Sequence, residues 1–235
     1  MNKTFCLLTM MIITSIGYGQ TAEQFFKRGR EKDSLKDHVN AVACYAMAAE
    51  LDPNNLNYCL MLALSKELIS DYSGAIEACT KCLLIDPKFD VIYYLRADAK
   101  KELQDYRGAI ADLTKSIQFN PKESKLYYER GRAKAFINDD SGAVADYTIA
   151  IQLKPTEATY YYWRGNIRNG KKDYLRAISD YTKAIQIDPY YTEAYRNRGA
   201  AKINLGQLNE GCLDWSKAGE LGDTEIYQFI NDYCN

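Results

Sequence analysis

The spacing of proline constrains the fold of this chain more than any other feature of its sequence. Five prolines occur, and each follows the one before it by 34 residues: Pro53, Pro87, Pro121, Pro155 and Pro189. A fixed period of this length is typical of repeat architectures, in which units too small to bury their own apolar faces stack on their neighbours. We therefore expect an array of repeats whose function resides on an extended surface.

Placing Pro53 at position 32 of a 34-residue unit defines six frames, residues 22–55, 56–89, 90–123, 124–157, 158–191 and 192–225. Two positions are small in every frame. Position 8 holds Gly29, Ala63, Ala97, Gly131, Gly165 and Gly199, and position 20 holds Ala41, Ala75, Ala109, Ala143, Ala177 and Gly211. Small residues let two helices cross closely, and apolar residues at helical spacing surround them. Each frame is predicted to be a hairpin of a helix A and a helix B.

Helix B has a predicted start and a predicted end. Position 16, just before it, is Asp37, Asp71, Asp105, Asp139 or Asp173 in the first five frames. Asp is a good N-cap because its carboxylate accepts hydrogen bonds from unpaired backbone N–H groups. Proline is not tolerated in a helix interior, so the recurring proline marks the turn into the next unit.

Two frames carry a resemblance to a known family most clearly. Their shared residues are Tyr127, Gly131, Ala143, Tyr147, Ala150 and Pro155 in the fourth frame, and Tyr161, Gly165, Ala177, Tyr181, Ala184 and Pro189 in the fifth. With these residues the sequence resembles the tetratricopeptide repeat family over residues 22–225. The resemblance implies an all-α, right-handed α-solenoid of six helix-turn-helix units.

Some positions depart from the family pattern. The bulky residue at position 4 is replaced by Cys59 in the second frame, and the sixth frame has Gly211 and Asp223 in place of alanine and proline. Units at the end of an array are expected to be atypical. Residues 226–235 place Ile226, Phe229, Ile230 and Tyr233 at helical spacing, which predicts a helix that caps the last apolar face.

The first 19 residues lie outside the repeat. Lys3 precedes an uncharged apolar run over residues 5–16, and the small residues Gly17 and Gly19 follow. A run of 12 residues is shorter than the roughly 20 that a spanning helix needs, so residues 1–19 are predicted to be a cleaved signal peptide. We expect a periplasmic or secreted protein that is not inserted in the membrane after cleavage.

The charge balance argues against electrostatic partners. The chain has 30 Lys and Arg against 31 Asp and Glu, with one His. No long run of one sign occurs, so the sequence carries no footprint for nucleic acid or for an anionic membrane.

Export makes the cysteines relevant, because disulfides persist in oxidising compartments. Cys59 and Cys82 fall at similar heights on the two helices of the second hairpin, and Cys212 similarly faces Cys234 on the tail helix. For Cys59 and Cys82 two interpretations stay open, small core residues or a disulfide, whereas a disulfide is favoured for Cys212 and Cys234. Cys79 and Cys82 lie three apart, but no further ligands complete a metal site, and no metal is expected.

Charged residues recur at matching heights on the two helices. Position 7 and position 23 hold Arg96 and Asp112, Arg130 and Asp146, Arg164 and Asp180, and Arg198 and Asp214 in the third to sixth frames. The second frame has Leu62 and Ala78 at these places, and Arg28 faces Cys44 in the first. We predict an Arg–Asp bridge inside each of the last four units. The alternative is that these arginines bind a ligand.

Position 11 is basic throughout, as Lys32, Lys66, Lys100, Lys134, Arg168 and Lys202. These residues form either a cationic strip for an acidic partner or long stems that pack over position 20 with their charges in solvent. The single histidine, His38, stands where other frames have tyrosine and is predicted to be a packing residue.

The resemblance implies that the A helices line an inner, concave face. Position 5 there reads Tyr94, Tyr128 and Tyr162 in three consecutive units, flanked by Trp163 and by Asp98, Arg132 and Asn166 at position 9. Tyr and Trp combine large contact area with a polar tip, which suits binding hot spots. These seven residues are the candidate partner-binding site, and the alternative is that the tyrosines only fill space between A helices. The Lys/Asn and Lys/Arg pattern with which some family members clamp a C-terminal carboxylate is missing at Phe26, Arg30, Val91 and Leu95.

No pattern in the chain predicts catalysis. Nucleophile motifs, phosphate-binding loops and metal-ligand motifs are absent from the sequence, so neither an enzyme nor a cofactor is expected. The leading hypothesis is an interaction scaffold that binds a protein or peptide segment in the concave groove. The alternative is an assembly factor at the cell envelope that acts by self-association or through its convex face. The sequence leaves the partner and the oligomeric state open.

Overall fold

The structure is a computed structural model that describes residues 20–234. These residues form thirteen α-helices and no strand. The helices are α2 (Ala22–Ser34), α3 (His38–Leu51), α4 (Leu56–Leu68), α5 (Tyr72–Ile85), α6 (Asp90–Glu102), α7 (Tyr106–Phe119), α8 (Ser124–Phe136), α9 (Asp140–Leu153), α10 (Ala158–Gly170), α11 (Tyr174–Ile187), α12 (Thr192–Asn204), α13 (Leu208–Glu220) and α14 (Ile226–Tyr233). Even-numbered helices from α2 to α12 are the predicted A helices, and odd-numbered helices from α3 to α13 are the B helices. The predicted signal peptide, residues 1–19, lies outside the described residues.

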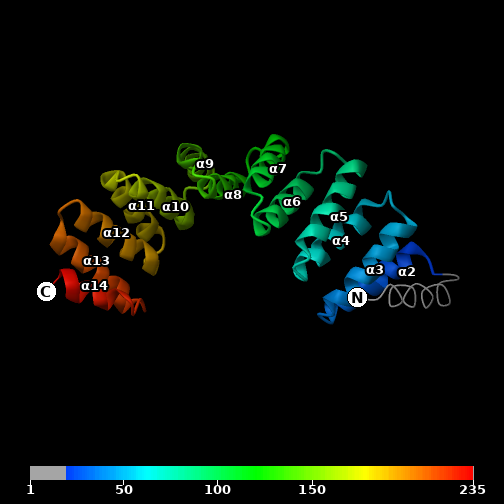
Figure 1. Ribbon diagram of the computed structural model, residues 1–235, viewed down its shortest axis with the longest axis horizontal. Coiled ribbons are helices and arrows are strands. Elements are labelled where there is room, and N and C mark those ends of the chain that lie inside the picture. Colours follow the sequence, from blue (N-terminus) through cyan, green and yellow to red (C-terminus); the bar gives the residue numbers. More distant parts are fainter. Residues whose placement is uncertain (1–19, 235) are drawn as a thin grey trace. The chain divides into compact units, whose positions relative to one another are not determined.

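The chain divides into two compact units, one ending at Gln104 and the other beginning at Asp105. In the first unit each helix from α2 to α6 packs against the next, and in the second the same holds from α7 to α14 (Figure 1). This consecutive packing of helix pairs is that of an all-α repeat solenoid, as the periodicity predicted. The division falls between α6 and α7, inside the third predicted repeat.

One backbone conformation reverses the chain between helix A and helix B. Position 15 has positive φ in all six repeats, at Lys36, Ser70, Gln104, Asn138, Lys172 and Gly206. In the first repeat the N–H of Asp37 then donates to the carbonyl of Lys32 at 2.9 Å, and Asp71 and Lys66 repeat the contact in the second. This left-handed turn satisfies carbonyls at the end of helix A. Sequence reasoning missed it, because only Asn138 and Gly206 are residue types that favour positive φ.

The predicted aspartate caps form in three of the five hairpins. Asp71, Asp105 and Asp139 accept hydrogen bonds of 2.9–3.0 Å from the N–H groups of Gly74, Gly108 and Gly142, respectively. A Cβ on any of these glycines would collide with the aspartate carboxylate.

The prediction was wrong for Asp37 and Asp173, which make no such bond. The residue three places on is not glycine in these hairpins. The Asn40 amide donates to both carboxylate oxygens of Asp37 at 2.9 Å, and the Arg176 guanidinium donates to Asp173 at 3.1 Å.

The small residue at position 8 is matched by the residue that faces it at position 24. A Cβ on Gly131 or Gly165 would lie 2.8 Å from the ring of Tyr147 or Tyr181. In the second repeat, where position 8 is Ala63, position 24 is the smaller Cys79. The rings of Tyr147 and Tyr181 are completely buried, so these pairs set how closely the two helices approach.

The departures in the last repeat explain one another. Arg196, which replaces the tyrosine of position 5, forms an ion pair with Asp223, which replaces the proline of position 32. Hydrogen bonds from Arg196 lower the pKa of the buried Asp223 carboxyl. Helix α14 packs against α13, where Phe229 and Tyr233 contact the ring of Trp215 with centroids 5.9 and 6.0 Å away.

Candidate functional site

A layer of charged side chains ties the hairpins of the second unit together. In the fourth repeat both Nε and Nη2 of Arg130 donate to the carboxylate of Asp146, at 2.9 and 2.7 Å. The same two-bond pairing joins Arg164 to Asp180 and Arg198 to Asp214. The aspartates are almost completely buried, and paired guanidinium groups offset the cost of burying such charges.

Each of these aspartates has a second cationic partner. Lys134 lies 2.8 Å from Asp146, Arg168 lies 2.7 Å from Asp180, and Lys202 lies 2.7 Å from Asp214. In the first two repeats the basic residue of position 11 pairs instead with the aspartate that precedes helix B, as Lys32 with Asp37 and Lys66 with Asp71. These five residues form neither a cationic strip for a partner nor a row of solvated charges. Each cationic group is instead paired with an aspartate of its own repeat.

The same arginines also reach back to the preceding repeat. Nη1 of Arg130 donates to Thr114 at 3.1 Å, Arg164 donates to Thr148 at 3.0 Å, and Arg198 donates to Thr182 at 3.1 Å. These threonines form a column at position 25, 34 residues apart. Sequence reasoning missed them, although the column was a usable signal.

In the first unit Arg96 donates to Thr80 at 3.1 Å and lies over the ring of Tyr93. The predicted bridge from Arg96 to Asp112 joins residues of different units and stays a prediction.

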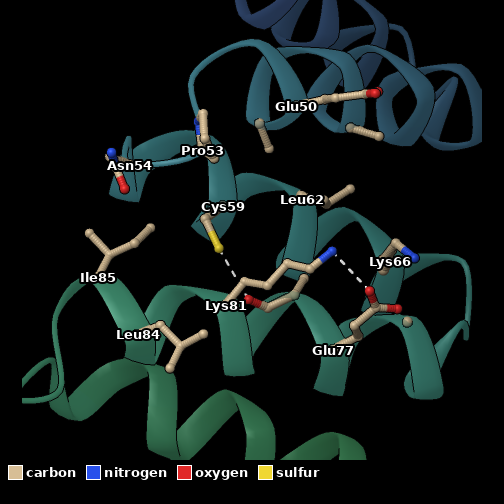
Figure 2. A pocket seen from close by; sticks show the side chains of 14 residues that line it. Glu50, Pro53, Asn54, Cys59, Leu62, Lys66, Glu77, Lys81, Leu84 and Ile85 are labelled. Carbon is tan, nitrogen blue, oxygen red and sulfur yellow. Dashed lines mark hydrogen bonds and ion pairs between the residues drawn. The ribbon is translucent and has the colours of Figure 1, made fainter.

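The second repeat has a cavity where the later repeats have this ionic layer (Figure 2). Leu62 and Ala78 replace the arginine and aspartate, and Ala46 replaces the threonine. With Cys59 and Ile85 these side chains line a cavity of about 740 Å³ between α3, α4 and α5. At its edge Lys81 is paired with Glu77 at 2.8 Å.

Two cysteine pairs are joined as disulfides. Cys59 of α4 is bonded to Cys82 of α5, and their Cα atoms are 5.6 Å apart. Cys212 of α13 is bonded to Cys234 after α14, with Cα atoms 5.9 Å apart. Cys44 and Cys79 belong to neither disulfide.

On and beside the A helices of the second unit lie two groups of packed aromatic side chains, which together we call the tyrosine face: Tyr128 with Tyr160, and Tyr162 with Trp163 and Tyr191. Tyr128 packs on Tyr160 at a centroid distance of 5.1 Å, and Tyr162 packs on Tyr191 at 4.9 Å and on Trp163 at 5.7 Å. Tyr128, Tyr162 and Trp163 are half-buried. The tyrosines therefore fill space between helices and also present part of each ring to solvent.

Polar side chains lie beside these rings. The Tyr181 hydroxyl donates to Oδ1 of Asn166 at 2.8 Å, and the Asn197 amide donates to the same oxygen at 2.9 Å. Asn197 also donates to the Tyr162 hydroxyl at 3.2 Å. Asn166 is thereby held by two neighbours, one on α11 and one on α12.

Arg132 occupies the place of Asn166 one repeat earlier. Its guanidinium carbon is 5.8 Å from the centroid of the Tyr128 ring and 5.6 Å from that of Trp163, and Glu129 lies 3.7 Å from Nη1. Nε of Arg132 and the hydroxyl of Tyr147 are buried and have no hydrogen-bond partner among residues 20–234. Burial raises the pKa of Tyr147 above its usual value, so its hydroxyl stays protonated.

The corresponding face of the first unit is acidic. Asp98 pairs with Lys101 at 2.7 Å and makes a hydrogen bond with Glu67. Burial, followed by this contact with Asp98, raises the pKa of Glu67 to about 7. Tyr94 and Asp98 belong to this unit, so their predicted alignment with Tyr128 and Arg132 stays a prediction.

The single histidine makes a polar contact in addition to its place in the turn. Nδ1 of His38 lies 3.0 Å from Asp33, which also accepts a hydrogen bond of 2.9 Å from the Tyr45 hydroxyl.

Among residues 20–234, no group of three or more His, Cys, Asp and Glu side chains is arranged to hold a metal ion. No helix in this part of the chain is long and apolar enough to cross a membrane.

The tetratricopeptide repeat family matches residues 91–123 and 158–191, which are the third and fifth predicted repeats. No curated protein matches the sequence.

Several solved structures are similar in fold. MamA is 25% identical with a TM-score of 0.68, and the match covers 73% of this chain and 94% of MamA. YrrB, described as a TPR protein with an unusual peptide-binding site, is 15% identical with a TM-score of 0.69 over 80% of this chain and 97% of its own. PilF of Pseudomonas aeruginosa is 14% identical with a TM-score of 0.70, and the match covers 90% of this chain and 97% of PilF.

Family matches, consecutive helix pairs and similar solved structures agree with one another. Proteins built in this way generally act as interaction scaffolds without catalytic activity. Residues 91–123 and 158–191 match tetratricopeptide repeats, and the described residues have the fold of a tetratricopeptide repeat solenoid.

Proposed function

We propose that this protein binds an extended segment of a partner protein across the tyrosine face. The observation that carries the proposal is that Tyr128 and Tyr162 are half-buried and rest on further rings of the same unit. Rings held in this way lose little side-chain entropy on binding, and Tyr and Trp dominate the hot spots of protein interfaces.

Polar groups beside the rings supply specificity. Asn166 is fixed by Tyr181 and Asn197, so its amide nitrogen is oriented without a partner segment having to order it. Main-chain groups of an extended segment can pair with an amide of this kind. YrrB, a similar structure, is described as having a peptide-binding site, which supports the same kind of ligand.

A catalytic role has no support from the described side chains. The buried aspartates Asp146 and Asp180 belong to the Arg–Asp layer, where each already has two cationic partners. Groups committed to one another in this way contribute to stability instead of proton transfer.

We also propose that the chain is exported. The apolar N-terminal run of residues 5–16 and the two disulfides support export, since disulfides persist in oxidising compartments. N-terminal sequencing of protein recovered from cell fractions is expected to give Gln20 as the first residue. A cytoplasmic chain that retains Met1 would contradict this.

Peptide selection tests the binding proposal. The immobilised chain is offered a random peptide display library, and the selected peptides are measured again with Tyr128→Ala/Tyr162→Ala. We expect the double variant to lose binding about a hundredfold or more, since hot-spot residues contribute 2 kcal/mol or more each. Tyr190→Ala is the matched control, because Tyr190 is 78% exposed in a turn.

Helical content by circular dichroism confirms that the double variant is folded. Unchanged peptide binding by the folded variant would reject the tyrosine face as the binding surface. Light scattering over a range of concentrations tests the alternative of self-association, which a monomer at all concentrations would exclude.

A further inference from the structure

We propose that the tyrosine face includes a carboxylate subsite at Arg132 and Tyr147, which recognises an Asp or Glu side chain of the partner segment. The proposal rests on the function proposed above and adds the chemistry of the partner. It comes from two buried hydrogen-bond donors that have no acceptor among residues 20–234.

The first donor is the hydroxyl of Tyr147. Tyrosines recur at position 24, and the other two have acceptors: Tyr45 donates to Asp33 at 2.9 Å, and Tyr181 donates to Asn166 at 2.8 Å. Tyr147 is fully buried, and its hydroxyl has no partner within the described part of the chain.

Tyr147 lacks an acceptor among the described residues because of the residue type at position 9 of its repeat. Asn166 supplies the acceptor for Tyr181, but the equivalent residue beside Tyr147 is Arg132, whose guanidinium group can only donate. A neighbouring residue that accepts a hydrogen bond in one repeat is thus replaced by a second donor in the other. Because Arg132 cannot accept, the proton of the Tyr147 hydroxyl requires an acceptor other than the residue at position 9.

The second donor is Nε of Arg132, which is also buried and unpartnered among residues 20–234. The guanidinium plane is held by the rings of Tyr128 and Trp163, with centroids 5.8 and 5.6 Å away. Glu129 lies at the Nη1 end, 3.7 Å away, so it does not satisfy Nε. The arginine side chain as a whole remains 35% exposed, so part of it reaches solvent although Nε itself is buried.

A carboxylate fits this arrangement better than a neutral acceptor does. It has two oxygens that only accept, so one can take the Nε–H of Arg132 and the other the O–H of Tyr147. Hydrogen bonds between a guanidinium and a carboxylate are charge-assisted and are roughly twice as strong as neutral ones. Arginine stacked on aromatic rings is also preorganised, which lowers the entropy lost on binding.

The test is a selection with an oriented peptide pool whose members are acetylated at the N-terminus and amidated at the C-terminus, so that only side chains carry carboxylates. The full chain, Arg132→Gln, Tyr147→Phe and the control Arg176→Gln are each immobilised and offered the same pool. Arg176 is a suitable control because its side chain is 74% exposed on α11. Sequencing of the retained pool measures the enrichment of Asp and Glu over Asn and Gln at each position.

We expect the unmodified chain and the Arg176 control to enrich acidic residues about tenfold at one position, and Arg132→Gln to show no such enrichment. Tyr147→Phe is expected to reduce the enrichment about threefold and to leave the unfolding midpoint of the free chain unchanged or higher, because it removes an unpartnered buried hydroxyl. The same acidic enrichment with Arg132→Gln would overturn the proposal, as would a pool enriched only in uncharged residues.

These outcomes separate the two proposals. Enrichment of uncharged residues that depends on Tyr128 and Tyr162 would refute the carboxylate subsite and leave the tyrosine face as the binding surface. Acidic enrichment that depends on Arg132 but survives Tyr128→Ala/Tyr162→Ala would support the subsite and refute the tyrosine face. No enrichment at any position would count against both.

Discussion

The hairpin α4–α5 of the first unit and the hairpin α10–α11 of the second share one backbone plan but are held together by different chemistry. In α10–α11, Arg164 pairs with Asp180 across the hairpin, and Arg168 joins them. In α4–α5 these positions are apolar, a cavity of about 740 Å³ takes their place, and Cys59 is bonded to Cys82. A covalent link thus replaces an ionic one.

The comparison shows that two positions whose side chains contact each other differ together between repeats. The second repeat lacks both the arginine and the aspartate, and its basic Lys66 pairs with Asp71 instead. Retaining one buried charge without the other would cost more than losing both. Position 8 and position 24 change together for a steric reason, as Gly165 with Tyr181 and Ala63 with Cys79.

The largest expected effect comes from removing one member of the ionic layer. Asp180→Ala leaves Arg164 and Arg168 without their buried carboxylate, and we expect the free energy of unfolding of the second unit to fall by about 3–5 kcal/mol. Denaturant titration followed by circular dichroism measures this. Arg164→Leu/Asp180→Ala, which reproduces the apolar pair of the second repeat, is expected to recover part of the loss. A double variant less stable than Asp180→Ala would break the comparison.

The covalent link is expected to have a somewhat smaller effect. Cys59→Ala/Cys82→Ala removes a disulfide that closes a loop between residues 23 apart in sequence, which corresponds to about 3 kcal/mol of chain entropy in the unfolded state. Unfolding of the oxidised double variant, compared with the oxidised parent, measures the loss. Reducing agent is expected to destabilise the parent more than the double variant, which lacks this disulfide. An equal loss in both would show that the Cys59–Cys82 disulfide contributes nothing to stability.

The steric pairing of Gly165 with Tyr181 predicts a smaller change in stability. Helix propensity alone favours alanine at this position, but we expect the substitution to destabilise the chain. Gly165→Ala adds a Cβ 2.8 Å from the ring of Tyr181, which is held by its bond to Asn166. Alanine gains about 1 kcal/mol in an exposed helix, but overpacking costs about 1–3 kcal/mol, so a net loss of about 1 kcal/mol is expected. Thermal unfolding measures it, and Gly170→Ala, where a Cβ meets no atom within 4 Å, is the control. A stabilised Gly165→Ala variant would show that the ring can move.

The smallest expected effect is a dependence of stability on pH. It comes from the acidic face of the first unit, where the second unit has the cationic Arg132. The pKa of Glu67 is raised to about 7 in the folded chain, so the folded state holds a proton that the unfolded state releases near pH 4.5. The stability contributed by protonated Glu67 is therefore present below about pH 4.5 and is lost as pH rises through 7. After allowance for solvent screening, this amounts to roughly 1 kcal/mol.

Unfolding midpoints at pH 6 and pH 8 measure this difference, and Glu67→Gln is expected to reduce it. An equal difference in the parent and in Glu67→Gln would assign the pH dependence to another group.

Much of the fold could be predicted from the sequence because repetition makes weak signals add. A single proline or small residue indicates little, but the same residue type at one position of six frames indicates helix starts, ends and crossings. The left-handed residue at position 15 escaped prediction because Lys36, Ser70 and Asn138 are not residues that enforce positive φ. The caps of Asp37 and Asp173 were mispredicted because side chains three residues on compete for the carboxylate.

Less of the candidate site could be predicted. The tyrosine column and Arg132 were visible in the sequence, but whether a hydroxyl finds an acceptor depends on a neighbour of particular chemistry. Tyr147 and Tyr181 are the same residue at the same position, and only their surroundings, Arg132 or Asn166, distinguish them. The threonines that receive the arginines of the next repeat show the same limitation, since their role depends on contacts between repeats.

By itself, the sequence determined that the chain forms paired helices in a tetratricopeptide array, because backbone preferences and small crossing residues act within each hairpin and recur every 34 residues. Only the tertiary structure decided how the position-11 cations are paired, whether Cys59 and Cys82 form a core pair or a disulfide, and where two buried donors lack an acceptor within the described part of the chain. These outcomes depend on distances of a few ångströms between side chains from different helices, and periodicity along the chain does not specify such distances.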